Sequence, residues 1–127
     1  MKKIIKNDGG EISKFIYYDN FFTKTYYNSI FSWLTTLNYI KGYKNNGTKI
    51  DREQIWFDNY NNYFCKAWKS REERWKPNLY DKKLKEIEDN IKNKLNVEIN
   101  TCLVNKYNTG KDSISAHKDN SFSFGEY

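Results

Sequence analysis

Residues 80–95 carry the strongest periodic pattern in the chain, and this pattern restricts the fold more than any other feature. Apolar side chains recur there at steps of three or four residues, and lysine, glutamate and aspartate fill most positions between them. The apolar positions are Tyr80, Leu84, Ile87, Ile91 and Leu95. This spacing aligns one apolar stripe along a helix, with Pro77 near its start. The segment is therefore predicted to form an amphipathic helix that packs against other elements.

The remaining patterned segments indicate an α+β fold. A first helix is predicted over about 23–38, after the candidate caps Asp19 and Thr23, because apolar residues recur there at the same steps. Runs of β-branched and aromatic residues predict strands at 12–18, 50–57, 60–68 and 100–107, and polar and glycine residues predict a turn at 42–48. We therefore expect two helices packed on a partial antiparallel sheet.

The composition fits one small domain, with residues 1–11 as an N-terminal extension. Of the 127 residues, 38% are hydrophobic and 18% aromatic, which indicates a globular chain. The net charge of +6 is compatible with nucleic acid or another polyanion, although A/T-rich codons also favour lysine. Cys65 and Cys102 lack C-x-x-C spacing, and we find neither an apolar signal segment nor a run of membrane-spanning length. We expect a soluble, intracellular protein with reduced cysteines.

The one histidine, His117, lies two residues before Asp119 in a polar loop. Iron(II) oxygenases commonly hold their metal through two histidines and one carboxylate on one face of the ion. Residues i and i+2 of an extended chain point the same way, so His-x-Asp suits two of these ligands. A chance pair on a loop is the alternative for so short a motif.

The residues around this pair resemble the AlkB family of 2-oxoglutarate- and iron-dependent dioxygenases, most closely its nucleic-acid-repair branch. That family has a Phe-Asn pair, an apolar strand, Asn-x-Tyr, a glycine-containing loop and His-x-Asp. The matching positions here are Asn100, Leu103, Asn105, Tyr107, Gly110, Asp112, Ile114, His117 and Asp119, and Ile99 replaces the aromatic residue.

Upstream segments extend the resemblance from about residue 12 to residue 127. Arg52 and Gln54 match the family's Pro-Arg-x-Gln-x-x-Tyr-Gly segment. Tyr63 matches the first aromatic of a later turn, and Trp75, Pro77 and Leu79 match Trp-x-Pro-x-Leu. Asp51, Phe57, Asp58 and Cys65 depart from the family pattern.

The resemblance implies oxidative demethylation of an alkylated base in DNA or RNA, with Fe(II) and 2-oxoglutarate as cofactors. His117 and Asp119 would bind iron, and Asn105 and Tyr107 would bind 2-oxoglutarate carboxylates. Segment 52–68 would contact the nucleotide through Arg52, Gln54, Phe57 and Tyr63. The alternatives are core packing for the two aromatic residues and ordinary edge-strand positions for Asn105 and Tyr107.

Two family features have no counterpart among these residues. The family requires a second iron-binding histidine and a later arginine that binds 2-oxoglutarate, but the chain has one histidine, and no arginine follows Arg74. We therefore expect a C-terminally truncated single domain, with an incomplete double-stranded β-helix, or jelly roll, that is inactive alone. A separately encoded C-terminal half is a possible partner. The alternative function is a non-catalytic, basic nucleic-acid-binding or interaction module.

Overall fold

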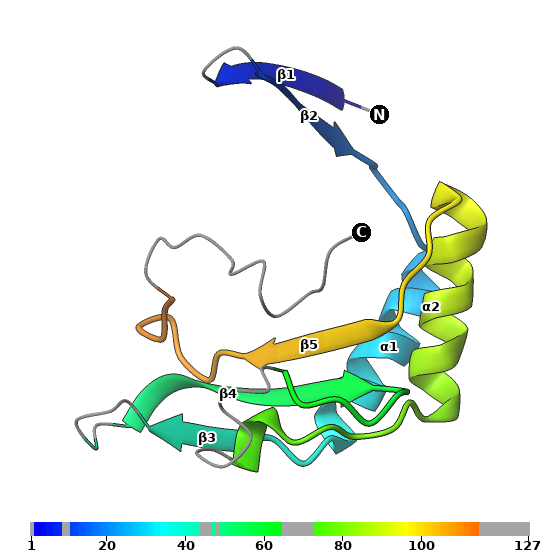
Figure 1. The fold of residues 1–127 in the computed structure, drawn as a ribbon. Coiled ribbons are helices and arrows are strands. Elements are labelled where there is room, and N and C mark those ends of the chain that lie inside the picture. The colour runs from blue at the N-terminus through cyan, green and yellow to red at the C-terminus, as the bar shows by residue number, and fades with distance from the viewer. Residues whose placement is uncertain (1, 9–10, 44–46, 48, 65–72, 115–127) are drawn as a thin grey trace. The chain divides into compact units, whose positions relative to one another are not determined.

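The structure, a computed structural model, describes residues 2–8, 11–43, 47, 49–64 and 73–114 (Figure 1). The chain divides into two units, Met1–Thr36 and Leu37–Tyr127. Two helices and antiparallel strands confirm the predicted α+β class. The jelly roll, and the packing of both helices on one sheet, remain predictions. No helix in the described part of the chain is long and apolar enough to cross a membrane.

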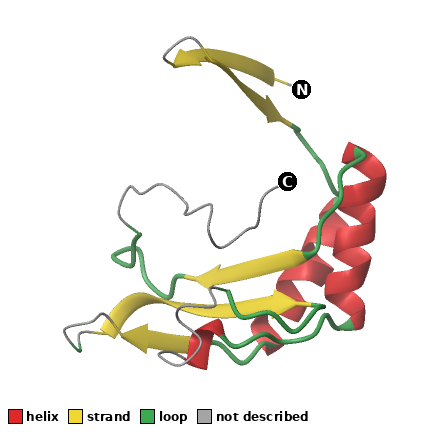
Figure 2. Cartoon of the chain, viewed as in Figure 1, coloured by secondary structure: helices red, strands yellow, loops and turns green. Residues whose placement is uncertain are grey.

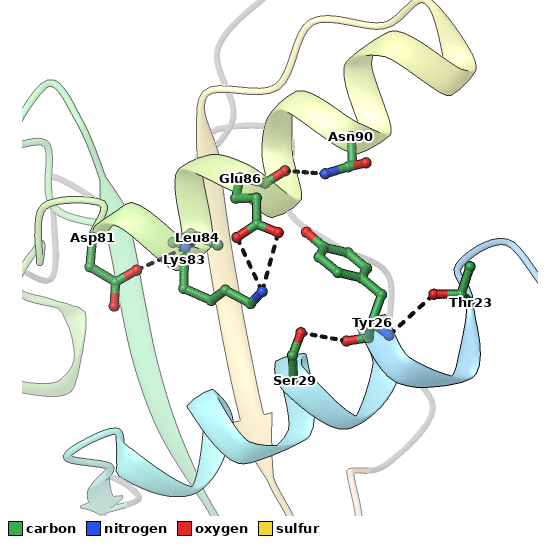
Figure 3. A network of polar contacts seen from close by, with 8 residues as sticks. All are labelled: Thr23, Tyr26, Ser29, Asp81, Lys83, Leu84, Glu86 and Asn90. Atoms are coloured by element: carbon green, nitrogen blue, oxygen red, sulfur yellow. Dashed lines mark hydrogen bonds and ion pairs between the residues drawn. The ribbon is translucent and has the colours of Figure 1, made fainter.

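The first unit contains a β-hairpin followed by a helix. Strand β1 (Lys2–Asp8) pairs antiparallel with β2 (Glu11–Tyr17), from Lys2 opposite Tyr17 to Asp8 opposite Glu11. Helix α1 spans Lys24–Thr36, and the Tyr26 backbone N–H donates to Thr23 Oγ1 at 3.2 Å (Figure 3). The predicted strand at 12–18, the helix and the Thr23 cap are therefore confirmed. Strand β1 is an additional element, within residues that the sequence assigned to an extension.

The second unit is built on a three-stranded antiparallel sheet in the order β3-β4-β5 (Figure 2). The strands are β3 (Ile40–Tyr43), β4 (Lys49–Asp58) and β5 (Thr101–Lys106). Strands β4 and β5 confirm the predictions at 50–57 and 100–107. The predicted turn at 42–48 is wrong at its first two residues, which complete β3, where the register with β4 shifts between Lys41 and Tyr43.

The segment after β4 is a turn, so the strand predicted at 60–68 is wrong for residues 60–64. Asp58 causes the reversal, because its Oδ1 accepts hydrogen bonds from the Tyr60 N–H at 2.7 Å and the Asn62 N–H at 3.1 Å. Residues 65–68 lie outside the described part. A short 3₁₀ helix, η2 (Glu73–Trp75), follows.

Helix α2 spans Lys82–Leu95 and confirms the amphipathic pattern, although it begins five residues after Pro77. Its N-cap is Asp81, whose Oδ1 accepts from the Leu84 N–H at 2.8 Å. Lys83 Nζ pairs with Glu86, and Asn90 Nδ2 donates to the Glu86 carbonyl at 2.8 Å (Figure 3). The helix ends at Asn96, which adopts the left-handed conformation at φ 53°.

The core of the second unit lies on both faces of the sheet. Strand β4 ends and β5 begins beside α2 (Figure 1). On one face of the sheet the Phe57 and Tyr80 rings meet edge to face, with 6.4 Å between their centroids. On the opposite face Trp56 packs edge to face against Phe64, which stacks on Trp75 at 4.4 Å. The buried apolar residues are Ile50, Ile55, Trp56, Phe57, Trp75 and Leu84. Burial on both faces explains the nearly continuous apolar run at the end of β4.

Candidate functional site

The register between β4 and β5 brings together three of the residues predicted to act in the site. Gln54 lies directly opposite Asn105, and Arg52 is two residues before Gln54 on the same strand. Side chains alternate along a strand, so all three lie on the face that also carries Trp56. Two motifs separated by 51 residues in sequence therefore meet at one place.

Hydrogen bonds join these three side chains through one oxygen atom. Gln54 Nε2 donates to Asn105 Oδ1 at 2.8 Å, and Arg52 Nε donates to the same oxygen at 3.2 Å. The Gln54 residue is 0% exposed whereas Asn105 is exposed, so their bond is partly buried. Only the oxygen of an amide group can accept two donors, and this determines which way the Asn105 amide is turned.

Beyond these bonds, the cluster has further N–H donors on Arg52 and Asn105, together with the Oε1 acceptor of Gln54. In the described part of the chain, no acceptor receives a hydrogen bond from Asn105 Nδ2, and no carboxylate forms an ion pair with Arg52. The neighbouring acid Glu53 points to the other face of β4, where it pairs with Lys106. We refer to Arg52, Gln54 and Asn105 as the donor cluster, because it offers N–H groups and one positive charge to an anion.

The opposite face of the same strands holds a paired set of charges. Glu53 Oε2 lies 3.3 Å from Lys106 Nζ, which in turn sits 5.0 Å from the centre of the Tyr39 ring. A hydrogen bond from the Asn108 side chain, together with Lys106, lowers the pKa of Glu53. Burial, with a smaller effect of Glu53, raises the pKa of Tyr39. Sequence analysis did not identify this set, since it depends on Glu53 lying opposite Lys106.

The loop after β5 is organised by one carboxylate. Asp112 Oδ2 accepts from the backbone N–H groups of Asn108 at 2.7 Å and Thr109 at 3.0 Å, and Oδ1 accepts from Thr109 Oγ1 at 2.9 Å. These hydrogen bonds lower the pKa of Asp112, and the bond from the Thr109 side chain has the largest effect. Tyr107, at the start of the loop, is 43% exposed. Asp112 therefore directs how the chain leaves the sheet.

The two aromatic residues predicted to contact a base have different surroundings. Phe57 is 5% exposed and packs against Tyr80, as the core-packing alternative describes. Tyr63 is half-buried in the turn that also holds Phe64. Stacking on a base stays a prediction for both, and the geometry favours Tyr63 over Phe57 for that role.

The predicted iron ligands His117 and Asp119 lie outside the described residues. Among the described residues, no group of three His, Cys, Asp or Glu side chains could hold a metal ion. One histidine and one aspartate provide two of the three ligands expected for iron, so the ligand set within these 127 residues is partial. In contrast, the donor cluster fits the carboxylates of 2-oxoglutarate, because it offers N–H donors and a guanidinium.

Comparison with models of known protein families and with curated proteins finds no match for this chain. The functional interpretation therefore depends on the motifs and on the geometry of the donor cluster.

Proposed function

We propose that the chain is the N-terminal part of a 2-oxoglutarate- and Fe(II)-dependent dioxygenase that demethylates alkylated bases in DNA or RNA. The observation that carries the proposal is the meeting of Arg52, Gln54 and Asn105. The AlkB-like motifs named these residues from two distant segments, and they share one hydrogen-bonded oxygen. If the two motif matches were coincidental, there would be no reason to expect their residues to contact each other in the structure.

In this proposal, the chain's own residues bind and orient the cosubstrate. Gln54 and Arg52 hold the Asn105 oxygen, so Asn105 Nδ2 is directed away from them and can donate to a carboxylate. Tyr107, an exposed residue just after the same strand, would supply a second neutral donor through its hydroxyl. His117 and Asp119 would hold iron, whose chemistry with 2-oxoglutarate and dioxygen would hydroxylate an N-methyl carbon. The remaining metal ligand would come from residues outside these 127.

The proposed substrate is an alkylated base within DNA or RNA. The net charge of +6 favours contact with phosphates, and Tyr63, in the turn after β4, would contact the base. A base must be flipped out or single-stranded to reach the active site of such an enzyme. We expect the affinity for an oligonucleotide to fall steeply as salt rises and to depend little on sequence.

The decisive test compares 2-oxoglutarate with glutarate, which lacks the 2-oxo group, in titrations of the chain with and without Mn(II). We expect 2-oxoglutarate to bind more tightly than glutarate only when the metal is present. His117→Ala should remove this difference, while Lys118→Ala, at the adjacent position, should preserve it. Equal binding of the two acids in the presence of Mn(II) would reject the dioxygenase proposal.

Turnover is the second test, with succinate release measured in the presence of Fe(II), 2-oxoglutarate and a methylated oligonucleotide. We expect no turnover by the 127 residues alone, and turnover when a polypeptide carrying the second histidine and the arginine is supplied. Turnover by the chain alone would show that another group completes the site. Oligonucleotide binding without any metal-dependent preference for 2-oxoglutarate would support the non-catalytic binding module instead.

A further inference from the structure

Arg52 occupies a position that its sequence motif does not explain. The motif assigned Arg52 to the nucleotide, but its Nε atom donates to Asn105, the residue proposed to bind 2-oxoglutarate. This bond uses one edge of the guanidinium group. The terminal N–H groups have no carboxylate partner in the described part of the chain. Arg52 therefore contacts Asn105 on β5, the residue proposed to bind 2-oxoglutarate.

The charges on this face of β4 support the same assignment. The residues of β4 that point to this face include Arg52, Gln54, Trp56 and Asp58. The one acid among them, Asp58, is 3% exposed, and its Oδ1 already accepts hydrogen bonds from the turn after β4. On β5, the residues of this face are Thr101, Leu103 and Asn105, which are uncharged. Within β4 and β5, the positive charge of Arg52 on this face has no neutralising carboxylate.

We propose that Arg52 is an anion-binding residue that holds a carboxylate of a small dicarboxylate, together with the Nδ2 group of Asn105. The inference rests on the proposed function only for the identity of that acid as 2-oxoglutarate. The guanidinium fork can hold a carboxylate through two parallel N–H bonds, and the amide of Asn105 adds a further donor beside it. Arg52 is half-buried and its Nε atom is held by Asn105 beside the fully buried Gln54, so the guanidinium has a fixed orientation toward a small anion.

The test uses glutarate without metal, so that it is independent of the dioxygenase chemistry. Glutarate is titrated into the ¹⁵N-labelled full chain, and the side-chain amide signal of Asn105 is followed by NMR, with Asn105→Asp used to assign it. We expect this signal to shift. Arg52→Gln should weaken glutarate binding about tenfold or more, because a charge-assisted hydrogen bond is lost. Arg52→Lys should recover part of the affinity, since it keeps the charge but not the planar fork.

Lys49→Gln is the matched control, because Lys49 is an exposed cation of the same strand that lies outside the donor cluster. It removes the same charge, and we expect it to change the affinity by less than about twofold. Equal losses of glutarate affinity in Arg52→Gln and Lys49→Gln would overturn the inference. Binding would then depend on the overall positive charge rather than on Arg52. An unmoved Asn105 signal would also overturn it. Thermal unfolding of each variant establishes that the fold is retained.

Inorganic phosphate and a single-stranded oligonucleotide provide the other arms of the titration. We expect phosphate to bind more weakly than glutarate, and oligonucleotide binding to change equally in Arg52→Gln and Lys49→Gln. If Arg52→Gln selectively weakens oligonucleotide binding, Arg52 is a nucleotide contact and the inference fails. The proposed function fails separately, through loss of the metal-dependent preference for 2-oxoglutarate, so the two failures are distinguishable.

Discussion

The two faces of the β4–β5 pair differ in how their charged side chains are partnered. Glu53 points to one face, where Lys106 lies opposite it at 3.3 Å and the Tyr39 ring lies beside the lysine. Arg52 points to the other face, where its side chain donates a hydrogen bond to the neutral amide of Asn105. One face therefore holds an ion pair, whereas on the other face Arg52 has no carboxylate partner among the described residues. The contrast separates a structural ion pair from a candidate binding site.

The largest effect should come from Asn105→Asp, which makes the donor face resemble the paired face. The new carboxylate keeps an acceptor for Gln54 and Arg52, but it removes the Nδ2 donor and repels an anion. We expect glutarate and 2-oxoglutarate to bind about a hundredfold more weakly, or about 3 kcal/mol, in titration calorimetry. Stability in urea should be unchanged or increased, since Arg52 gains a charged partner.

Asn93→Asp is the control for that prediction, because Asn93 is an exposed residue of α2 and the substitution adds the same charge elsewhere. Its effect on binding should be small. If both variants weaken binding equally, net charge rather than the donor cluster controls anion affinity.

A smaller effect is expected from Gln54→Leu, which removes the buried donor that supports Asn105. Gln54 is 0% exposed, and the lost hydrogen bond should lower the free energy of unfolding by about 1–3 kcal/mol in urea denaturation. Anion binding should also weaken, because Asn105 loses one of the two groups that orient it. Unchanged stability together with unchanged binding would mean that the cluster is not an organised unit.

The paired face should contribute less to stability. In a double-mutant cycle with Glu53→Gln and Lys106→Gln, we expect a coupling energy below about 1 kcal/mol, because the pair is partly exposed and screened. Neither variant should change glutarate binding by more than about twofold, since both positions are on the opposite face. A large effect on binding would remove the distinction between the two faces.

The smallest effect is the pH dependence of the paired face. The Asn108 hydrogen bond and Lys106 lower the pKa of Glu53 in the folded chain, so its stabilisation is present above the unfolded pKa, ordinarily near 4.5. It is lost as the pH falls through the folded pKa. The difference in unfolding free energy between the original chain and Glu53→Gln should therefore shrink on acidification below about 4.5. A difference that grows in acid would contradict this assignment.

Periodicity predicted the elements whose own sequence determines them. The helix at 82–95 and strand β5 follow from apolar spacing and β-branched content, which act within each segment. The strand expected over 60–64 was wrong, because its aromatic residues suggested a strand while Asp58 capped the backbone into a turn. Strand β1 was not recognised, although Gly9 and Gly10 between the paired Asp8 and Glu11 are typical of a two-residue hairpin turn.

The candidate site could be predicted only as a set of residues. Motif similarity named Arg52, Gln54 and Asn105, but it did not predict that they share a hydrogen bond. That bond depends on the register of two strands, and a shift of one residue would move Gln54 to the other face. Periodicity also could not separate packing from binding for Phe57, since both roles use the same side chain. His117 and Asp119 stay predictions from the sequence.

The bond between Gln54 and Asn105 spans 51 positions of the sequence. An unfolded chain loses considerable entropy when residues so far apart meet. The contacts of the sheet offset this loss only after the sheet has formed. The donor cluster therefore exists only in the folded second unit, and an anion that binds there should stabilise that unit by mass action. We therefore expect glutarate to slow amide hydrogen exchange across β4 and β5, because binding at the donor cluster stabilises the folded sheet against opening.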